Sequence, residues 1–314
     1  KLGNQAVWLP RRVTLRTHQP LEVGATGQTG AAGPMLSLSL KSWLPEKQAA
    51  TVDVTGKLGG TDFALPSQQV SLESGKTVAA SLPLPAPFAA QADAAAASGQ
   101  KAQLHWKVTP LGGAPLEGDL EAEFRRGSRC GKLAAAPALD GRFSPTEWEG
   151  ATKLSGFVKH DDAKPSARAT EVYVGHTAEK LYIAYLCHGQ PQPKAAERPR
   201  DGAVWEDDCA EIFLQPPGTE TYYHLAVNAA GSQFDARCPG SDASWSPEWQ
   251  AKAGRLADGW LVEVAVPWKS LGATGSGAWR VNFGREEADT KAATCWSPTF
   301  GGFHVPGRFG DMTF

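Results

Sequence analysis

The sequence contains no long apolar run, no excess of one charge and almost no helical periodicity. No stretch approaches the ~18 consecutive apolar residues that a membrane-spanning helix needs. The formal net charge of the 314-residue chain is −2, with both signs spread along it, which disfavours nucleic acid and membrane surfaces as partners. The length is typical of about two domains. We therefore expect neither nucleic-acid binding nor membrane insertion.

Cysteine and methionine are scarce as well, with 5 Cys and 2 Met. The cysteines show neither CxxC nor Cys/His spacing, which argues against a zinc site. Their odd number leaves at least one thiol unpaired, and one or two disulfides would fit an exported protein. We expect an extracellular, cell-surface or periplasmic location.

Glycine and proline punctuate short segments in which apolar and polar residues alternate. This period of two is typical of half-buried strands and favours an all-β chain. Such segments predict an immunoglobulin-like β-sandwich over residues 1–129, which would serve as a spacer or support. The glycine-rich run 24–33 lacks the Lys-Ser/Thr ending of a phosphate loop and is interpreted as an ordinary loop. The expected strands of this half are 11–17, 35–43, 50–58, 68–74, 76–84, 101–108 and 119–127.

The second half, residues 130–314, predicts another β-sandwich, reached through a small, polar linker at 127–137. Its segments are longer and more aromatic, and eight of the eleven tryptophans lie from Trp148 onward. Tryptophan rings stack on the apolar faces of sugars, although sandwich cores also use them. One helical turn is expected at 267–272. The expected strands are 171–177, 181–187, 209–216, 222–228, 260–268 and 279–286.

Side-chain parity assigns the polar residues of these strands to one face of a sheet. Trp205 and Glu211 fall opposite the apolar residues of the segment 204–216. His224 and Asn228 fall on the corresponding face of 222–228. Arg285 breaks the parity of its segment unless Gly284 forms a bulge. The predicted face mixes aromatic, acidic, amide and guanidinium groups, as sugar hydroxyls require.

The order and spacing of several motifs in the second half resemble the family 9 carbohydrate-binding module and the wider group of DOMON-like sandwiches. The motifs are LDG with a following Trp, LYIAYLC, WEDDCAEIFL, YHLAVNAAG, GWLVEVAVPWKSLG, WRVNFGRE and the ending from Cys295. The resemblance implies a non-catalytic sandwich that binds a polysaccharide or a sugar end. It implies an aromatic clamp of Trp205 and Trp296, with hydrogen bonds from Glu211, Asn228 and Arg285.

The same resemblance implies a structural calcium ion. The candidate ligands are Asp207, Asp208 and Asp161, with Asp140 and Asp162 as further acids, although the spacing of a calcium loop is missing. The chain is also expected to work beside other domains of a larger secreted or cell-surface protein.

Three alternatives remain open at this point. Glu211 and Glu263 would form the carboxylate pair of a glycosidase if they faced each other across a cleft. Some DOMON-like domains carry electrons through a b-type haem, for which His188, His224, His304 and Met312 are the candidate ligands. The fold is also compatible with a structural or adhesive module at a cell surface that binds no sugar.

Overall fold

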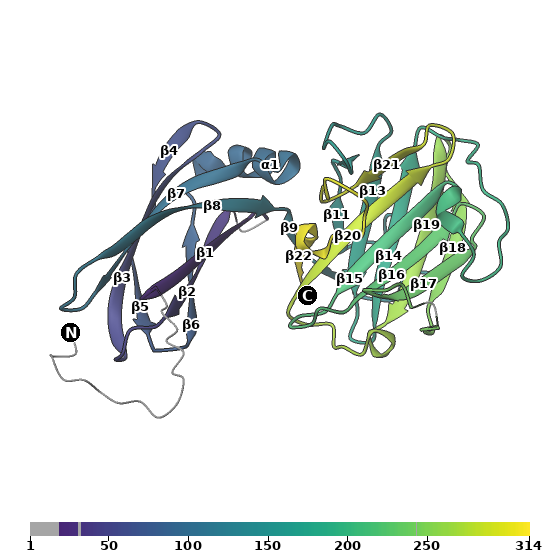
Figure 1. Cartoon of the computed structure of the whole chain (residues 1–314). Helices are drawn as coiled ribbons and strands as arrows, with labels where there is room; N and C mark the ends of the chain where they lie inside the picture. Colours follow the sequence, from purple (N-terminus) through teal and green to yellow (C-terminus); the bar gives the residue numbers. More distant parts are fainter. Residues whose placement is uncertain (1–18, 31–32, 243) are drawn as a thin grey trace, which may run out of the picture.

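The computed structural model describes residues 19–30, 33–242 and 244–314. It consists of two β domains that lie side by side and are joined where β8 leads into β9 (Figure 1). The all-β expectation and the two sandwiches are confirmed. The expected strand at 11–17 lies outside the described residues. In the part of the chain that the structure describes, no helix is long and apolar enough to cross a membrane.

The first domain has the strand pairing of an immunoglobulin-like sandwich. Strand β1 pairs antiparallel with β2 on one side and parallel with β8 on the other. The sheet order is β4-β3-β7-β8-β1-β2-β6, with β5 paired to β3. Its strands are β1 Leu21–Gln28, β2 Met35–Ser42, β3 Gln48–Leu58, β4 Thr61–Ala64, β5 Gln68–Leu72, β6 Thr77–Pro83, β7 Lys101–Pro110 and β8 Leu116–Arg125.

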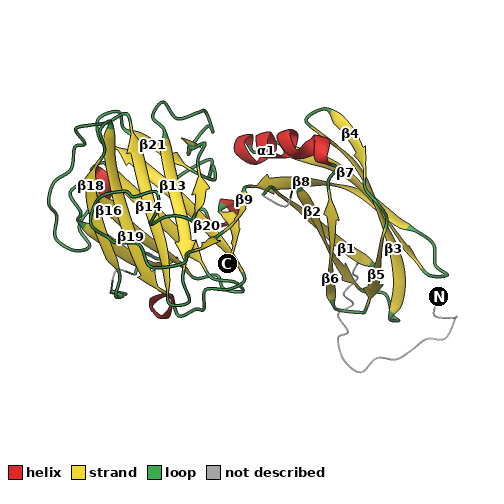
Figure 2. Cartoon of the chain, turned by 180° about the vertical axis from the view of Figure 1, so that it is seen from behind, coloured by secondary structure: helices red, strands yellow, loops and turns green. Residues whose placement is uncertain are grey.

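Two features of this domain differ from the sequence-based expectation. Helix α1, Ala89–Ser98, follows the short 3-10 turn η1, Ala86–Phe88, and is the long red helix of Figure 2. The run 24–33 is also not entirely a loop, because residues 24–28 belong to β1. A Cβ at Gly27 would lie 2.5 Å from the ring of Phe124, so glycine here allows close packing of β1 on β8.

The second domain is a sandwich of two mostly antiparallel sheets. One has the order β10-β13-β14-β19-β18, with β11 paired to β13. The other has the order β12-β21-β20-β15-β16-β17, with β22 paired to β20 and β9. Its strands are β9 Gly127–Arg129, β10 Gly131–Lys132, β11 Thr152–Leu154, β12 Val158–Lys159, β13 Thr170–His176, β14 Lys180–His188, β15 Cys209–Gln215, β16 Tyr222–Asn228, β17 Gln233–Cys238, β18 Gln250–Arg255, β19 Gly259–Pro267, β20 Ala278–Glu287, β21 Ala292–Cys295 and β22 Gly310–Thr313.

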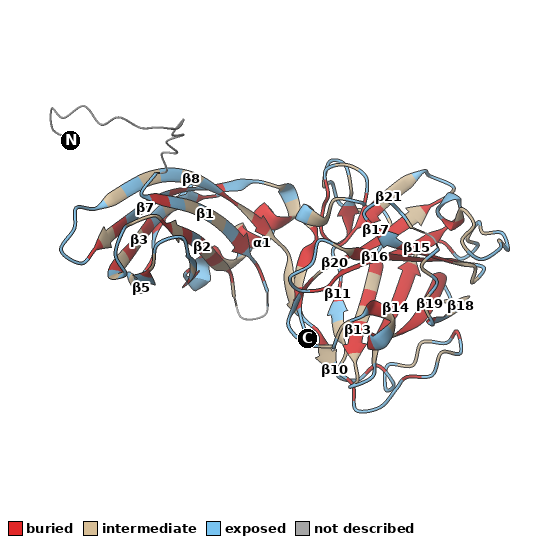
Figure 3. Cartoon of the chain, turned by 60° about the horizontal axis from the view of Figure 1, so that its bottom comes forward, coloured by how far each residue is buried: buried red, intermediate tan, exposed pale blue. Residues whose placement is uncertain are grey.

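Apolar clusters lie both between the two sheets and on their outer faces. The inner layer contains Ile212, Leu225 and Val264, as parity predicts. A smaller cluster with Phe213 and Phe309 covers the outer face of the sheet that contains β15. Figure 3 shows how much of the second domain is buried along its strands. Three 3-10 turns complete the domain: η2 Val204–Glu206, η3 Trp268–Leu271 and η4 Pro306–Arg308.

The residues expected to form a linker instead pair with the second domain. Strand β9 pairs in parallel with β22, and β10 pairs in parallel with β13. The chain therefore enters both sheets of the second domain directly after β8. The boundary at residues 129 and 130 stays a prediction. Contacts across the junction include a hydrogen bond from Arg125 Nε to the carbonyl of Gly307 at 3.0 Å and an ion pair between Arg308 and Glu123 at 3.2 Å.

Candidate functional site

A cavity of about 470 Å³ opens on the outer face of the β15 sheet. It contains Trp205 and Glu211, two of the predicted sugar-binding residues, and His224, which parity placed on the same face, together with residues that the sequence did not single out for the site. The cavity is lined by Trp205, Glu211, His224, Phe234, Ser241, Glu286, Phe303 and His304.

The polar floor of the cavity comes from three neighbouring strands. Glu211 pairs in register with Ala226 on β16 and with Gly284 on β20. His224 is therefore a diagonal neighbour of Glu211, and its Nε2 lies 2.7 Å from Oε2 of Glu211. Glu286 is the diagonal neighbour on the other side, because it pairs with Cys209. The outward parity predicted for Glu211 and His224 is confirmed.

The two carboxyls have different surroundings. Burial raises the pKa of Glu286 to about 8, and the nearby charge of Glu211 adds to this, while Lys291 opposes it. Glu211 instead has the imidazole of His224 as a partner. A second histidine, His304, is bound to the hydroxyl of Tyr222 at 3.0 Å. Burial and the charge of His224 lower the pKa of His304.

Trp205 lies on the turn η2 rather than on a strand. Strand β15 begins only at Cys209, so parity does not determine the position of Trp205. Its side chain is 43% exposed at the cavity. The ring contacts Phe234 edge-on, with centroids 5.0 Å apart. An exposed indole beside a polar floor can stack on an apolar surface of a ligand.

Asn228 lies on the predicted face but does not line the cavity. It is fully buried, and its Nδ2 donates to the carbonyl of Ala196 and to Asp207 at 2.8 and 2.7 Å. Its Oδ1 accepts from the backbone N–H groups of Ala230 and Ser232. The Asn228 amide therefore forms hydrogen bonds only within the protein, where it stabilises the loop that follows β16.

Arg285 points into the sandwich instead of outward. Strand β20 pairs with β15 without a bulge, with Gly284 opposite Glu211 and Arg285 opposite Ala210. The predicted break in parity therefore does not occur. The guanidinium is fully buried and donates to the carbonyls of Ala169 and His188, to Thr170 and to Gln190. It links the two sheets and has no route to the cavity.

Trp296 is also remote from the Trp205 cavity. Its side chain is buried within the inner layer, where it contacts Phe283 with centroids 6.2 Å apart. Its edge faces a different hollow of about 420 Å³, which Thr29 and Arg126 also line at the junction of the domains. The structure therefore does not bring Trp205 and Trp296 together as the two sides of a clamp.

The acids proposed for calcium already have partners within the protein. Asp207 accepts from Arg198 and Asn228; burial opposes its ionisation, but these bonds together lower its pKa. Asp208 accepts from Gln190, from the backbone of Lys194 and from Ala288 N at 3.0 Å. Asp161 caps its own exposed turn.

These carboxylates do not fit a calcium ion. The cation of Arg198 lies against Asp207, where it would repel a second cation. Within residues 19–30, 33–242 and 244–314, no group of three or more His, Cys, Asp or Glu side chains is arranged to hold a metal. Calcium therefore has no part in the function proposed below.

The carboxylate pair proposed for a glycosidase is separated by the fold. Glu211 lies on the outer face of the β15 sheet, whereas Glu263 lies on β19 in the other sheet. Glu263 accepts from the backbone N–H groups of Asp140 and Gly141 at 3.1 and 2.9 Å. Glu263 therefore holds the turn at residues 139–141 in place and does not face Glu211.

The candidate haem ligands are dispersed. Met312 is buried in the inner layer, and His188 is bound to Asp258 at 3.1 Å. His224 and His304 share the cavity, with ring centroids 4.9 Å apart. Each of these two rings already has a protein partner, Glu211 and Tyr222 respectively.

All cysteines are buried and unpaired. The expected disulfides are therefore absent from the described residues, which include Cys130, Cys187, Cys209, Cys238 and Cys295. Burial raises the pKa of the Cys130 thiol to about 12. Such thiols pack as small apolar side chains and carry no reactivity into the site.

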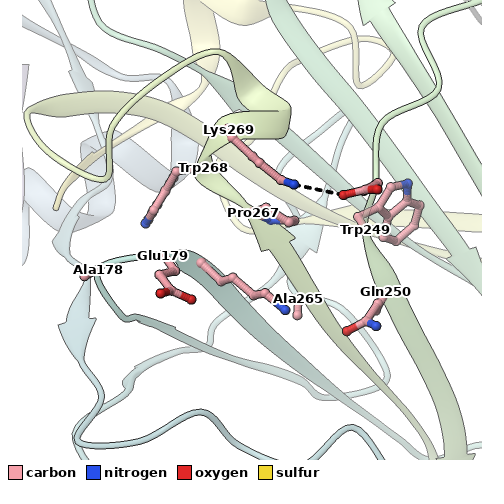
Figure 4. Close-up of a pocket in the computed structure, with 10 residues that line it drawn as sticks. Ala178, Glu179, Trp249, Gln250, Ala265, Pro267, Trp268 and Lys269 are labelled. Carbon is pink, nitrogen blue, oxygen red and sulfur yellow. Dashed lines mark hydrogen bonds and ion pairs between the residues drawn. The ribbon is translucent and has the colours of Figure 1, made fainter.

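A larger cavity, of about 830 Å³, lies elsewhere on the second domain. Figure 4 shows Trp268 and Trp249 on opposite sides of it, with Pro267 and Ala265 between them. Both tryptophans are almost fully buried, and Lys269 forms an ion pair with Glu248 at 3.0 Å. It contains none of the sugar-binding residues predicted from the sequence and presents no exposed aromatic ring.

The comparison with protein families matches a segment of the second domain. Residues 157–244 match the family model described as carbohydrate-binding family 9. The family 9 resemblance of the second domain is confirmed. This matched segment contains Trp205, Glu211 and His224, and thus most of the cavity floor.

Two solved structures are similar to part of the chain. A protein from Bacteroides uniformis described as carbohydrate-binding has a TM-score of 0.50 at 18% identity, over 60% of this chain and 98% of its own. A family 9 module from Caldicellulosiruptor kristjanssonii, in complex with cellotriose, has a TM-score of 0.45 at 17% identity, over 59% of this chain and 92% of its own. No curated protein matches the chain.

Sequence reasoning missed Glu286, Phe303, His304 and Phe234 as lining residues of the cavity. Parity alone would have placed Glu286 beside Glu211, because an unbulged β20 turns Gly284 and Glu286 outward. Phe234 lies on β17, opposite Ala226 in the register, but no strand was expected there. Phe303 and His304 lie on the loop before η4, where period-two patterns give no position. Only the folding of that loop over the outer face brings Phe303 and His304 to the cavity.

Proposed function

We propose that the family 9 domain binds carbohydrate in the cavity on the outer face of the β15 sheet, without catalysing a reaction. Trp205 supplies the stacking surface, and the Glu211–His224 pair supplies hydrogen bonds to hydroxyls. The observation that carries the proposal is an exposed indole at the rim of a cavity whose floor holds a buried, hydrogen-bonded carboxylate.

The composition of the lining suits a sugar. A pyranose presents apolar C–H groups on its faces and hydroxyls around its edge. Trp205 and Phe303 offer apolar surface, while Glu211 and His224 offer an acceptor and a ring nitrogen. The volume of about 470 Å³ falls within the range of about 300–1,000 Å³ that is usual for small-ligand sites. A sugar end or short oligosaccharide is therefore the proposed ligand, rather than a long chain along an open groove.

The clamp proposed from the sequence changes in one respect. Trp205 retains its role, whereas Trp296, Asn228 and Arg285 are assigned to the support of the domain. Their polar groups or rings are buried and engaged elsewhere. Phe303 is the aromatic side chain on the loop before η4 that replaces Trp296 as a cavity wall.

The first domain is proposed to support the family 9 domain. Arg125 and Glu123 of the first domain contact Gly307 and Arg308 in the turn η4 of the second domain. These contacts hold the two domains together near the loop that carries Phe303. Export, and attachment to further domains of a surface protein, belong to the same proposal.

A glycan array with the intact chain tests the function, followed by calorimetric titration of the best soluble sugars. Glucose and cellotriose are suitable first ligands. The proposal expects saturable binding and no new reducing ends after prolonged incubation with an oligosaccharide. Failure to bind any glycan would favour the structural or adhesive alternative. Release of reducing ends would show catalysis instead, and a Soret band in the purified protein would show haem.

A further inference from the structure

The cavity lining contains acidic side chains but no strongly basic ones among the described residues. Its titratable side chains are the carboxyls of Glu211 and Glu286 and the imidazoles of His224 and His304. Among the described residues, no lysine or arginine lines it. A ligand with a negative charge would find no lysine or arginine there, whereas an ammonium group would find two carboxyl groups that can accept its hydrogen bonds.

Glu286 is a half-buried acid of the domain whose charge is little compensated by its surroundings. Within the part of the chain that the structure describes, its side chain has neither a hydrogen-bonding partner nor an ion pair. Six buried acids have partners inside the protein: His224 for Glu211, Arg198 for Asp207, Gln190 for Asp208, Trp249 for Asp235, Gly141 for Glu263 and Arg168 for Glu287. Half-buried Asp311 has no such partner among the described residues, but two cations, Arg125 and Arg280, act on its charge.

The groups that face Glu286 explain why its charge is not compensated. Strand β15 brings Glu211 and the Cys209 thiol toward it, β16 brings His224, and the Phe303 loop brings His304. Lys291, on the turn after β20, is the one cation that acts on it, and its influence is smaller than that of burial and of Glu211. These surroundings therefore favour the neutral form of the Glu286 carboxyl at neutral pH.

We propose that the cavity selects sugars that carry a primary amine, with the ammonium group placed against Glu286 while the ring stacks on Trp205. This inference rests on the proposed sugar-binding function of the same cavity and names the substrate class. The carboxyl of Glu286 loses its proton to solvent as the ammonium arrives, and an ion pair forms where no protein cation is available. Uronic acids are disfavoured because no lysine or arginine lines the cavity among the described residues.

Calorimetric titration at pH 6.5 tests the selection with glucosamine, glucose, N-acetylglucosamine and glucuronic acid. N-acetylglucosamine keeps the nitrogen substituent but lacks its charge, so it controls for shape. We expect glucosamine to bind at least about tenfold more tightly than either neutral sugar, because a hydrogen bond between charged partners adds roughly this much. Glucuronic acid should bind most weakly.

Two variants locate the effect. In Glu286→Gln the ratio of the glucosamine to the glucose affinity should fall to about one. Glu206→Gln removes an exposed acid next to Trp205 that pairs with Arg198 and does not line the cavity. It should leave both affinities unchanged. Thermal unfolding of each variant confirms that it is folded.

Proton release provides a second measurement that needs no variant. Titration of glucosamine in two buffers with different ionisation enthalpies should show release of up to one proton per site, and glucose should show none. Equal affinities for glucose and glucosamine without proton release would overturn the inference and leave sugar binding intact. Absence of binding by every sugar would instead refute the proposed function itself.

Discussion

Nε2 of His224 lies 2.7 Å from Oε2 of Glu211, across the neighbouring strands β16 and β15, on the outer face of their sheet. Both side chains are about 5% exposed. The acid cluster around Glu211 thus supplies a carboxylate that pairs with a histidine and not with a second acid. This pair fixes the position of the carboxylate in the lining of the cavity.

Replacing Glu211 by Gln should weaken sugar binding by about tenfold, because a charged acceptor is exchanged for a neutral amide. Titration calorimetry measures the change. Glu263→Gln is the matched control, since Glu263 is an equally buried acid on the outer side of the other sheet. Both variants should lose about 1–2 kcal/mol of unfolding free energy, but only the first should lose affinity. Equal losses of affinity in the two would contradict the assignment.

The stability of the protein should depend on pH through Glu286. Its pKa is about 8 in the folded state, against about 4.3 in an unfolded chain. The folded state therefore binds more protons between these values, and the free energy of unfolding falls as the pH rises from 5 to 8.

Glu286→Gln should remove much of this slope and stabilise the protein at pH 8 by about 1–3 kcal/mol, less than the full linkage value because the cavity is open to solvent. Urea denaturation at pH 5, 6.5 and 8 provides the measurement. If the wild type and Glu286→Gln gave parallel pH profiles, Glu286 would have an ordinary pKa.

Arg285→Met should destabilise the protein by about 2–4 kcal/mol, because the carbonyls of Ala169 and His188 would lose their buried donor. Arg280→Met, on the same strand but half-buried on its other face, should cost less than about 1 kcal/mol. Chemical denaturation compares the two. A small loss in Arg285→Met, combined with a large loss of sugar affinity, would return Arg285 to the binding site.

A calcium chelator should leave the melting temperature unchanged to within about 1 °C, because the nearest carboxylates already accept protein hydrogen bonds. Differential scanning calorimetry of the intact chain, with and without chelator and with added calcium, tests this. A chelator-induced fall of several degrees that calcium reverses would reveal an ion site formed by other ligands.

Alternation of polar and apolar residues predicted most strands of both sandwiches, because each strand has one face on a core. The same rule placed Glu211 and His224 correctly on the outer face. It was misapplied at Arg285, where an unbroken β20 continues the alternation and turns a guanidinium into the inner layer. Trp205 precedes β15, so its exposure results from the turn η2 and not from strand parity.

Features that depend on tertiary contacts were not accessible in this way. Helix α1 has a nearly uniform run of alanine and carries little amphipathic pattern, and it is held by the burial of Ala92, Ala95 and Ala96. Trp296 lies near the expected place in the chain, but its ring fits against Gly310 inside the sandwich. The loop that carries Phe303 and His304 takes the position that the resemblance had assigned to Trp296.

Titration of Trp205→Ala against the wild type, with the tightest-binding soluble glycan, tests the central claim most directly. The account predicts that affinity falls by about tenfold or more while the melting temperature changes little, since an aromatic platform for a ligand contributes roughly 1–3 kcal/mol. Phe300→Ala, another exposed aromatic of the second domain that does not line the cavity, should bind like the wild type. Unchanged affinity in Trp205→Ala would contradict the account.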